Sequence, residues 1–172
     1  MSEAAREIIP ENNPAPEVLP EARPPMAWHG FLVGFMLWLG AAWRLFQAAW
    51  ILSGKIYFYE AVRSAVYSGL GALRILDYAL AAACIAAAVL LVLARSSLKR
   101  RQRAGISRLL AAYMVSAAAM ILYLLGRWCI SGLPPLSFAP LGQAASCIAL
   151  VLVNRSYYGK RRSLFAEKSK GV

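Results

Sequence analysis

The sequence has few of the residues on which metal and redox chemistry depend. It contains one histidine, His29, and its three cysteines, Cys84, Cys129 and Cys147, are isolated and form no C-x-x-C pair. A membrane thiol oxidase would need such a pair, and no ligand spacing such as H-E-x-x-H predicts a metal site. P-loop and G-x-S-x-G motifs are also lacking. We therefore predict no metal and no other cofactor, and we expect a protein that is not an enzyme.

Charged residues are also scarce. They make up 16% of the 172 residues, against about 25% in an ordinary soluble domain, whereas hydrophobic residues make up 60% and the mean hydropathy is +0.53. Most of the charges are basic, 19 Lys and Arg against 8 Asp and Glu, for a net charge of +11. Because the basic residues cluster beside apolar runs, they favour an anionic membrane surface as the partner, and nucleic acid is not expected.

Four apolar runs are long enough to cross the hydrocarbon core of a bilayer, roughly 30 Å thick, which takes about 20 helical residues. They cover residues 27–52, 75–94, 109–127 and 140–158. The last is the least regular, because Pro134 and Pro135 precede it and Pro140 is tolerated only in the first turn of its helix. The predicted fold class is all-α, an integral membrane protein with four antiparallel transmembrane helices, and residues 27–158 form its membrane domain.

The distribution of Lys and Arg predicts the orientation of these spans. Fourteen lie on one side of the predicted membrane and four on the other, with Arg44 inside the first span. Positively charged loops stay in the cytoplasm, so we expect both termini to be cytoplasmic, in a bacterial plasma (inner) membrane. Residues 1–26, rich in Pro and Glu, are expected to form a disordered tail, and residues 159–172 a basic tail.

The basic residues that flank the last three runs are candidate contacts to anionic lipid. Each Lys or Arg close to an anionic surface adds about 1 kcal/mol of attraction. The candidates are Arg95, Lys99, Arg100, Arg101, Arg103, Arg108, Lys160, Arg161 and Arg162.

Five polar residues lie inside the predicted spans or at their outer ends, where charge is costly, rare and usually paired. They are Arg44, Gln47, Asp77, Arg127 and Gln143. Two interpretations remain open. Arg44, Asp77 and Arg127 would form a charge cluster, an outward-facing polar site for an anionic headgroup or solute. Alternatively, the arginines reach toward the headgroups, and Asp77 pairs with Arg74 or caps its helix.

Two patterns concern helix packing. The first span contains "GFLVG", in which Gly30 and Gly34 are four residues apart, and Ala41 follows seven residues later. Such small residues let helices approach closely, either within this chain or in a homo-oligomer or a complex with another membrane protein, although they also abound in any Gly- and Ala-rich helix. In the first outer loop, apolar residues recur at helical spacing and predict a short interfacial helix before Gly69.

The stretch "NRSYYGKRRSLF", residues 154–165, resembles the aromatic and basic stop that closes many small bacterial four-helix inner-membrane proteins of unknown function. The resemblance implies the four-span layout and carries over no functional residue. We expect a small multi-pass membrane protein with a structural, assembly or regulatory role. The alternative is a small transporter or lipid-handling protein that uses Arg44, Asp77 and Arg127.

Overall fold

The computed structural model describes residues 26–55, 60–132 and 139–165, and within these ranges it contains helices and no strand. The first apolar run forms one continuous rod: α1 (Ala27–Phe31), a π-helical segment η1 (Leu32–Met36) and α2 (Leu37–Leu52). It is followed by α3 (Glu60–Gly69), α4 (Gly71–Lys99), α5 (Arg103–Ser131), α6 (Ala139–Gly159) and a short 3₁₀ helix, η2 (Arg162–Leu164). Alanine and leucine, the strongest helix formers among apolar residues, dominate the long helices.

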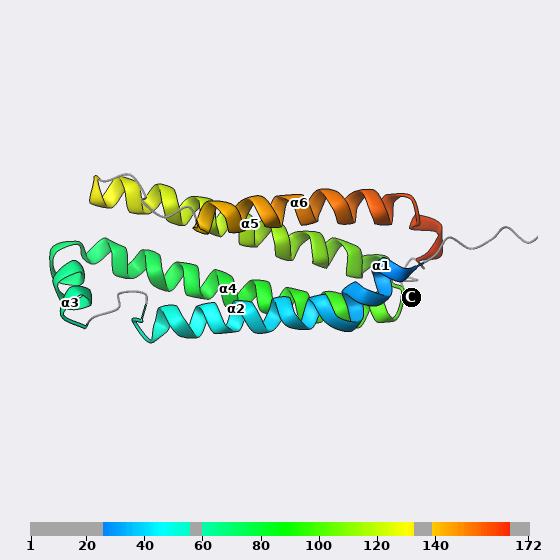
Figure 1. The fold of residues 1–172 in the computed structure, drawn as a ribbon, viewed down its shortest axis with the longest axis horizontal. Coiled ribbons are helices and arrows are strands. Elements are labelled where there is room, and N and C mark those ends of the chain that lie inside the picture. The colour runs from blue at the N-terminus through cyan, green and yellow to red at the C-terminus, as the bar shows by residue number, and fades with distance from the viewer. Residues whose placement is uncertain (1–25, 56–59, 133–138, 166–172) are drawn as a thin grey trace, which may run out of the picture.

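The long helices form an elongated antiparallel bundle (Figure 1). In it α2 packs against α4, α4 against α5, and α5 against α6. The start of α1, the α4–α5 turn and the end of α6 lie at one end, which we call the basic end, and α3 lies at the other, the α3 end (Figure 1). The two ends therefore receive the loop residues that the sequence assigned to opposite sides of a membrane.

Three of the predicted spans coincide with helices that are long and apolar enough to cross a membrane: Ala27–Leu52, Gly71–Lys99 and Arg103–Ser131. The first has the predicted bounds. The second and third extend past 75–94 and 109–127, because the backbone ladder of a helix continues into polar sequence where no Pro or Gly stops it. The fourth helix, α6, lies where the fourth run was predicted and has Pro140 in its first turn, but it is not among the three. Gln143, Asn154 and Arg155 lower its hydropathy, and its crossing of a membrane remains a prediction.

The outer-loop and tail predictions have different outcomes. Helix α3 confirms the short helix expected before Gly69. The disordered N-terminal tail was predicted over residues 1–26, of which 1–25 lie outside the described residues, as do residues 166–172 of the basic tail.

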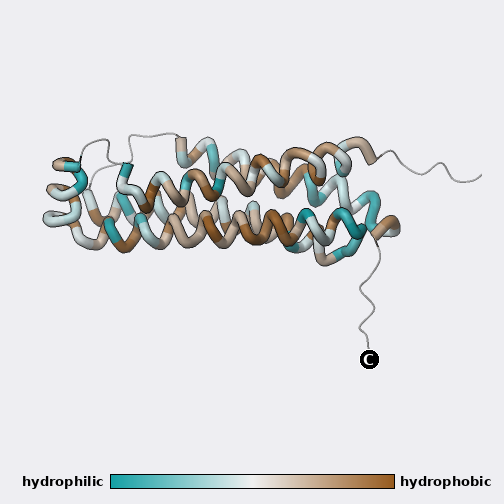
Figure 2. The backbone as a smooth tube through the Cα atoms, turned by 90° about the horizontal axis from the view of Figure 1, so that it is seen from below, coloured by the Kyte–Doolittle hydropathy of each residue, from teal (hydrophilic) through white to brown (hydrophobic). Residues whose placement is uncertain are grey.

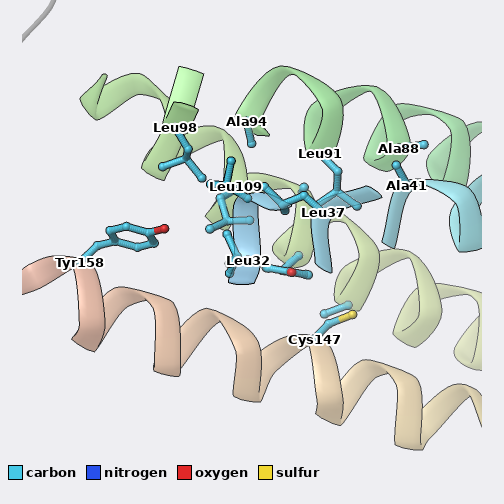
Figure 3. Close-up of a cluster of buried hydrophobic side chains, with 14 of the residues drawn as sticks. Leu32, Leu37, Ala41, Ala88, Leu91, Ala94, Leu98, Leu109, Cys147 and Tyr158 are labelled. Carbon is cyan, nitrogen blue, oxygen red and sulfur yellow. The ribbon is translucent and has the colours of Figure 1, made fainter. Parts of the chain in front are cut away.

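The core consists of two hydrophobic clusters stacked along the bundle. One lies toward the basic end and contains Leu32, Leu37, Leu91, Leu98 and Leu109 (Figure 3). The other lies toward the α3 end and contains Ile51, Leu80, Cys84, Met120 and Tyr123. Outside both clusters, large apolar side chains are exposed, among them Trp38 at 51% and Leu122 at 63%. Hydrophobic residues occupy much of the middle of the tube in Figure 2, as in a bundle that faces lipid.

The α4–α5 turn depends on one close backbone approach. Arg101 adopts a left-handed conformation, with φ of 52°, and the Gln102 amide donates to the Ser97 carbonyl at 3.0 Å. The chain then returns so tightly that a Cβ atom on Gly105 would lie 2.7 Å from the backbone nitrogen of Leu98. Only glycine fits here without a backbone shift.

We therefore expect Gly105→Ala to destabilise the bundle by about 1–3 kcal/mol, the usual range for overpacking. The measurement is thermal unfolding in detergent micelles. Gly142→Ala is the matched control, since Gly142 also lies in the first turn of a helix and a methyl group there would meet no atom within 4 Å. Equal melting temperatures for the two variants would contradict the close approach at Leu98.

Candidate functional site

The five polar residues predicted to lie in or beside the spans belong to two separate groups of contacts. Arg44, Gln47 and Gln143 are hydrogen-bonded to one another between α2 and α6. Asp77 accepts hydrogen bonds from two tyrosines, and Arg127 lies over the ring of one of them, Tyr123. Among the described residues no ion pair joins Asp77 to Arg44 or Arg127. The three-charge cluster is therefore not present as direct contacts, and Asp77 and Arg127 are linked through Tyr123.

The first group is centred on Arg44, which is 6% exposed. Its Nη1 donates to Gln47 Oε1 and its Nη2 to Cys147 Sγ, both at 3.1 Å. The amides of Gln47 and Gln143 exchange two hydrogen bonds, each of 3.1 Å. Arg44 and Gln47 are three residues apart on α2, and Gln143 and Cys147 are four apart on α6, so each pair shares one helix face. The two faces meet as a polar layer.

This layer separates the two hydrophobic clusters. On α2, Ala41 belongs to one cluster and Ala48 to the other, with Arg44 between them. The acidic residues of the described ranges are Glu60 and Asp77, and neither is bound to Arg44. The hydrogen-bond partners of the Arg44 guanidinium are the Gln47 amide and the Cys147 thiol. Among the described residues no carboxylate is bound to Arg44 within the layer.

Two further hydrogen bonds extend this contact toward the basic end. Trp28 Nε1 donates to Asn154 Oδ1 at 3.2 Å, and His29 Nδ1 and the Tyr158 hydroxyl share a bond of 3.0 Å. We call the four pairs Trp28–Asn154, His29–Tyr158, Arg44–Cys147 and Gln47–Gln143 the polar seam. It joins the first rod to α6, although their backbones stay farther apart than those of the other neighbouring helices.

The sequence analysis missed most of the seam. Cys147, Asn154 and Tyr158 were not singled out as site residues, and neither were Trp28 and His29. A signal was present on α6, where Gln143, Cys147, Asn154 and Tyr158 follow at spacings of four, seven and four. That pattern marks one helix face carrying hydrogen-bonding groups.

Asp77 is 1% exposed and holds two helices to α4. Its Oδ1 accepts from the Tyr123 hydroxyl of α5 at 2.9 Å, and its Oδ2 accepts from the Tyr67 hydroxyl of α3 at 2.8 Å. Burial, followed by the hydrogen bond to Asp77 and the charge of that carboxylate, raises the pKa of Tyr67 to about 12. Tyr67 therefore keeps its proton below about pH 10, and the bond is lost only as the pH rises through the higher pKa.

The local alternatives for Asp77 are not observed. Arg74 turns to Tyr78, donating from Nε to the hydroxyl at 3.3 Å and lying 5.5 Å from the ring centre. The N-cap of α4 is Leu70, and Asp77 lies well inside the helix. Arg63, Tyr67, Arg74 and Tyr78 line a cavity of about 370 Å³ at the α3 end.

The nine basic candidates at the basic end differ in what they contact. Four bind acceptors within the chain: Arg95 Nε donates to the Val33 carbonyl at 3.0 Å, Arg103 Nε to the Phe165 carbonyl at 3.1 Å, Arg108 Nη1 to Ser97 Oγ, and Arg161 Nη1 to the Tyr157 carbonyl at 3.4 Å. Arg161 lies 4.1 Å from the centre of the Tyr157 ring. Lys99, Arg100, Arg101, Lys160 and Arg162 are exposed.

The glycine face of the first span is not packed within this chain. A methyl group on Gly30 or Gly34 would meet no atom within 4 Å, whereas Ala41 is 2% exposed in the core. The π-helical turn at Leu32–Met36 explains the difference, because it adds a residue and rotates the following helix. Arg95 binds a carbonyl of this turn and lies 4.8 Å from the ring centre of Trp38.

Comparisons with known proteins add no assignment to this geometry. No family model matches the chain, and no similar curated protein or solved structure was found. Within the described ranges no group of three His, Cys, Asp or Glu residues is arranged to hold a metal ion.

The contacts of Asp77 predict strong coupling to Tyr123. Asp77→Asn places an amide against a buried hydroxyl, and we expect it to destabilise the bundle by about 1–3 kcal/mol. Tyr123→Phe should have a similar cost, and the double variant should cost clearly less than the sum. Thermal unfolding of the four proteins gives this cycle, and strict additivity would contradict the hydrogen bond.

Proposed function

We propose that the protein is a four-span membrane protein, with both termini and the basic end in the cytoplasm, that acts without catalysis by binding other membrane components in a structural, assembly or regulatory role. The observation that carries the proposal is that the surfaces not packed within this chain lie on the outside of the bundle. Inside the bundle, Arg44, Gln47, Asp77 and Gln143 are bound to other side chains. The surfaces that remain for function are on the outside.

Insertion is supported by the lengths and surfaces of the helices. Three helices are long and apolar enough to span a bilayer. Helix α6, with 21 residues, rises about 31 Å at 1.5 Å per residue, close to the thickness of the hydrocarbon core. Of the Lys and Arg residues outside the predicted spans, fourteen are assigned to the side of the membrane that includes the basic end and four to the opposite side. This asymmetry supports the cytoplasmic assignment.

Lateral binding is supported by the outer face of the first rod. Gly30 and Gly34 are open to a partner, and the aromatic side chains of Phe31, Phe35 and Trp38 beside them are about half exposed. In lipid, helices associate through close packing of small residues and not through the hydrophobic effect. An open glycine face flanked by large rings fits a second transmembrane helix.

The number of spans can be tested with the native Cys129, which is exposed near the end of α5 on the α3 side of the bundle. We expect a membrane-impermeant maleimide to label Cys129 in intact cells. In a Cys129→Ser background, a cysteine introduced at the exposed position 163 (Ser163→Cys) should react with the maleimide only after the cells are permeabilised. Labelling of both positions from the same side would show that α6 does not cross the membrane and would contradict four spans.

The lateral surface can be tested by native mass spectrometry after gentle extraction. A Cβ atom at Gly34 would meet no atom of this chain within 4 Å, so Gly34→Leu should leave the fold intact. The population of a homo-oligomer or partner complex should fall about tenfold, equivalent to 1.4 kcal/mol. Gly142→Leu is the control, because Gly142 is equally open but lies on α6.

Two outcomes of that measurement would argue against the proposal. Identical complexes in wild type and Gly34→Leu would exclude the glycine face. A lone chain that retains an anionic solute would favour the alternative, a small transporter or lipid-handling protein. The observation in favour of that alternative is the cavity of about 370 Å³ that Arg63 and Arg74 line beside the Tyr67–Asp77 bond.

A further inference from the structure

A groove of about 490 Å³ follows the last turns of α6 at the basic end. It is lined by Leu152, Val153, Ser156, Tyr157, Lys160 and Arg161. These residues form pairs at successive spacings of four, so they make two adjacent rows on one side of the helix. The backbone amide of Lys160 still donates to the Ser156 carbonyl, at 3.3 Å, and so continues the rows past the end of α6.

The groove changes character along its length. Leu152 and Val153 are 62% and 51% exposed and form an apolar surface on the side of the bundle middle. Ser156 presents a hydroxyl about 6 Å farther along, at 1.5 Å per residue, and Lys160 and Arg161 place two positive charges about 12 Å from Leu152 and Val153. Apolar, hydroxyl and cationic groups thus follow in the order in which a bilayer passes from hydrocarbon to headgroup.

The guanidinium of Arg161 is held in place by its neighbour. It lies 4.1 Å from the centre of the Tyr157 ring, and its Nη1 donates to the Tyr157 carbonyl at 3.4 Å. A guanidinium has five N–H donors, and stacking on a ring reduces the freedom that it would lose on binding an anion. Glu60 and Asp77, the acidic residues in the described ranges, belong to α3 and to the start of α4, toward the α3 end (Figure 1).

We propose that this groove binds one anionic phospholipid, with its phosphate against Lys160, Arg161 and the Ser156 hydroxyl and an acyl chain along Leu152 and Val153. The site rests on the proposed membrane insertion but not on the lateral binding role. A free phosphate would use only the cationic end. The apolar rows and their alignment with the helix favour a lipid.

The test is native mass spectrometry of the full chain, released from micelles that contain equal amounts of phosphatidylglycerol and phosphatidylcholine with identical acyl chains. Wild type should retain phosphatidylglycerol in preference. Lys160→Gln/Arg161→Gln should weaken that retention about tenfold, because two charges that bind the phosphate are removed. Lys99→Gln/Arg100→Gln, which removes equal charge from exposed positions at the same end of the bundle, should retain the lipid like wild type.

A second pair of variants separates the groove from charge alone. Tyr157→Leu keeps both cations but removes the ring that supports Arg161, and it should reduce retention severalfold. Tyr157→Phe keeps the ring and should behave like wild type. Circular dichroism and melting temperature confirm that each variant is folded.

Three results would overturn the site. Equal losses in the Lys160/Arg161 and Lys99/Arg100 variants would indicate diffuse attraction without a site. Retention unchanged in every variant would indicate lipid bound elsewhere, and displacement by excess inorganic phosphate would indicate a site for a free anion. If cysteine labelling supports four spans while any of these occurs, the lipid site fails and the proposed insertion stands.

Discussion

Closure of the bundle depends on hydrogen bonds between side chains of the first rod and of α6. The backbone of α4 approaches those of α2 and α5 closely, whereas α6 packs against α5 and contacts the first rod through the polar seam. In the proposed membrane environment the hydrophobic effect gives no net attraction between helices, so such bonds and close packing would decide which helices are neighbours. Without the seam α6 would keep its contact with α5 but lose its rotation and register against the first rod.

The seam also accounts for the buried charge. A lone cation in the core carries a desolvation penalty of several kcal/mol, and the Arg44 guanidinium recovers part of it from Gln47 and Cys147. The Gln47–Gln143 pair then uses the oxygen of each amide as acceptor and its nitrogen as donor. Because these groups bind one another, the polar residues between the helices explain specificity of folding more directly than they explain chemistry on a substrate.

The helices were predictable from the sequence, and most contacts between them were not. Runs of apolar residues gave the first rod its correct bounds and placed α6, since length and composition decide whether a helix forms. Which faces meet depends on helix rotation, and the π-helical turn changes it between Gly34 and Ala41. Similarly, the bond of Tyr67 to Asp77 requires the fold of the outer loop, which charge spacing does not specify. Gly105 was not noticed because a close approach needs a partner surface as well as a small residue.

In the four-span arrangement proposed above, α6 is the helix whose insertion needs most support, because it is the least hydrophobic of the four. The same polar residues that lower its hydropathy, Gln143 and Asn154, bind Gln47 and Trp28 of the first rod. These two polar side chains are therefore paired inside the bundle and would not face lipid. In the proposed arrangement, Lys160 and Arg161 after the end of the helix would lie at the headgroups and set its depth. Hydropathy alone underestimates such a helix, since it counts a paired polar side chain as though it faced hydrocarbon.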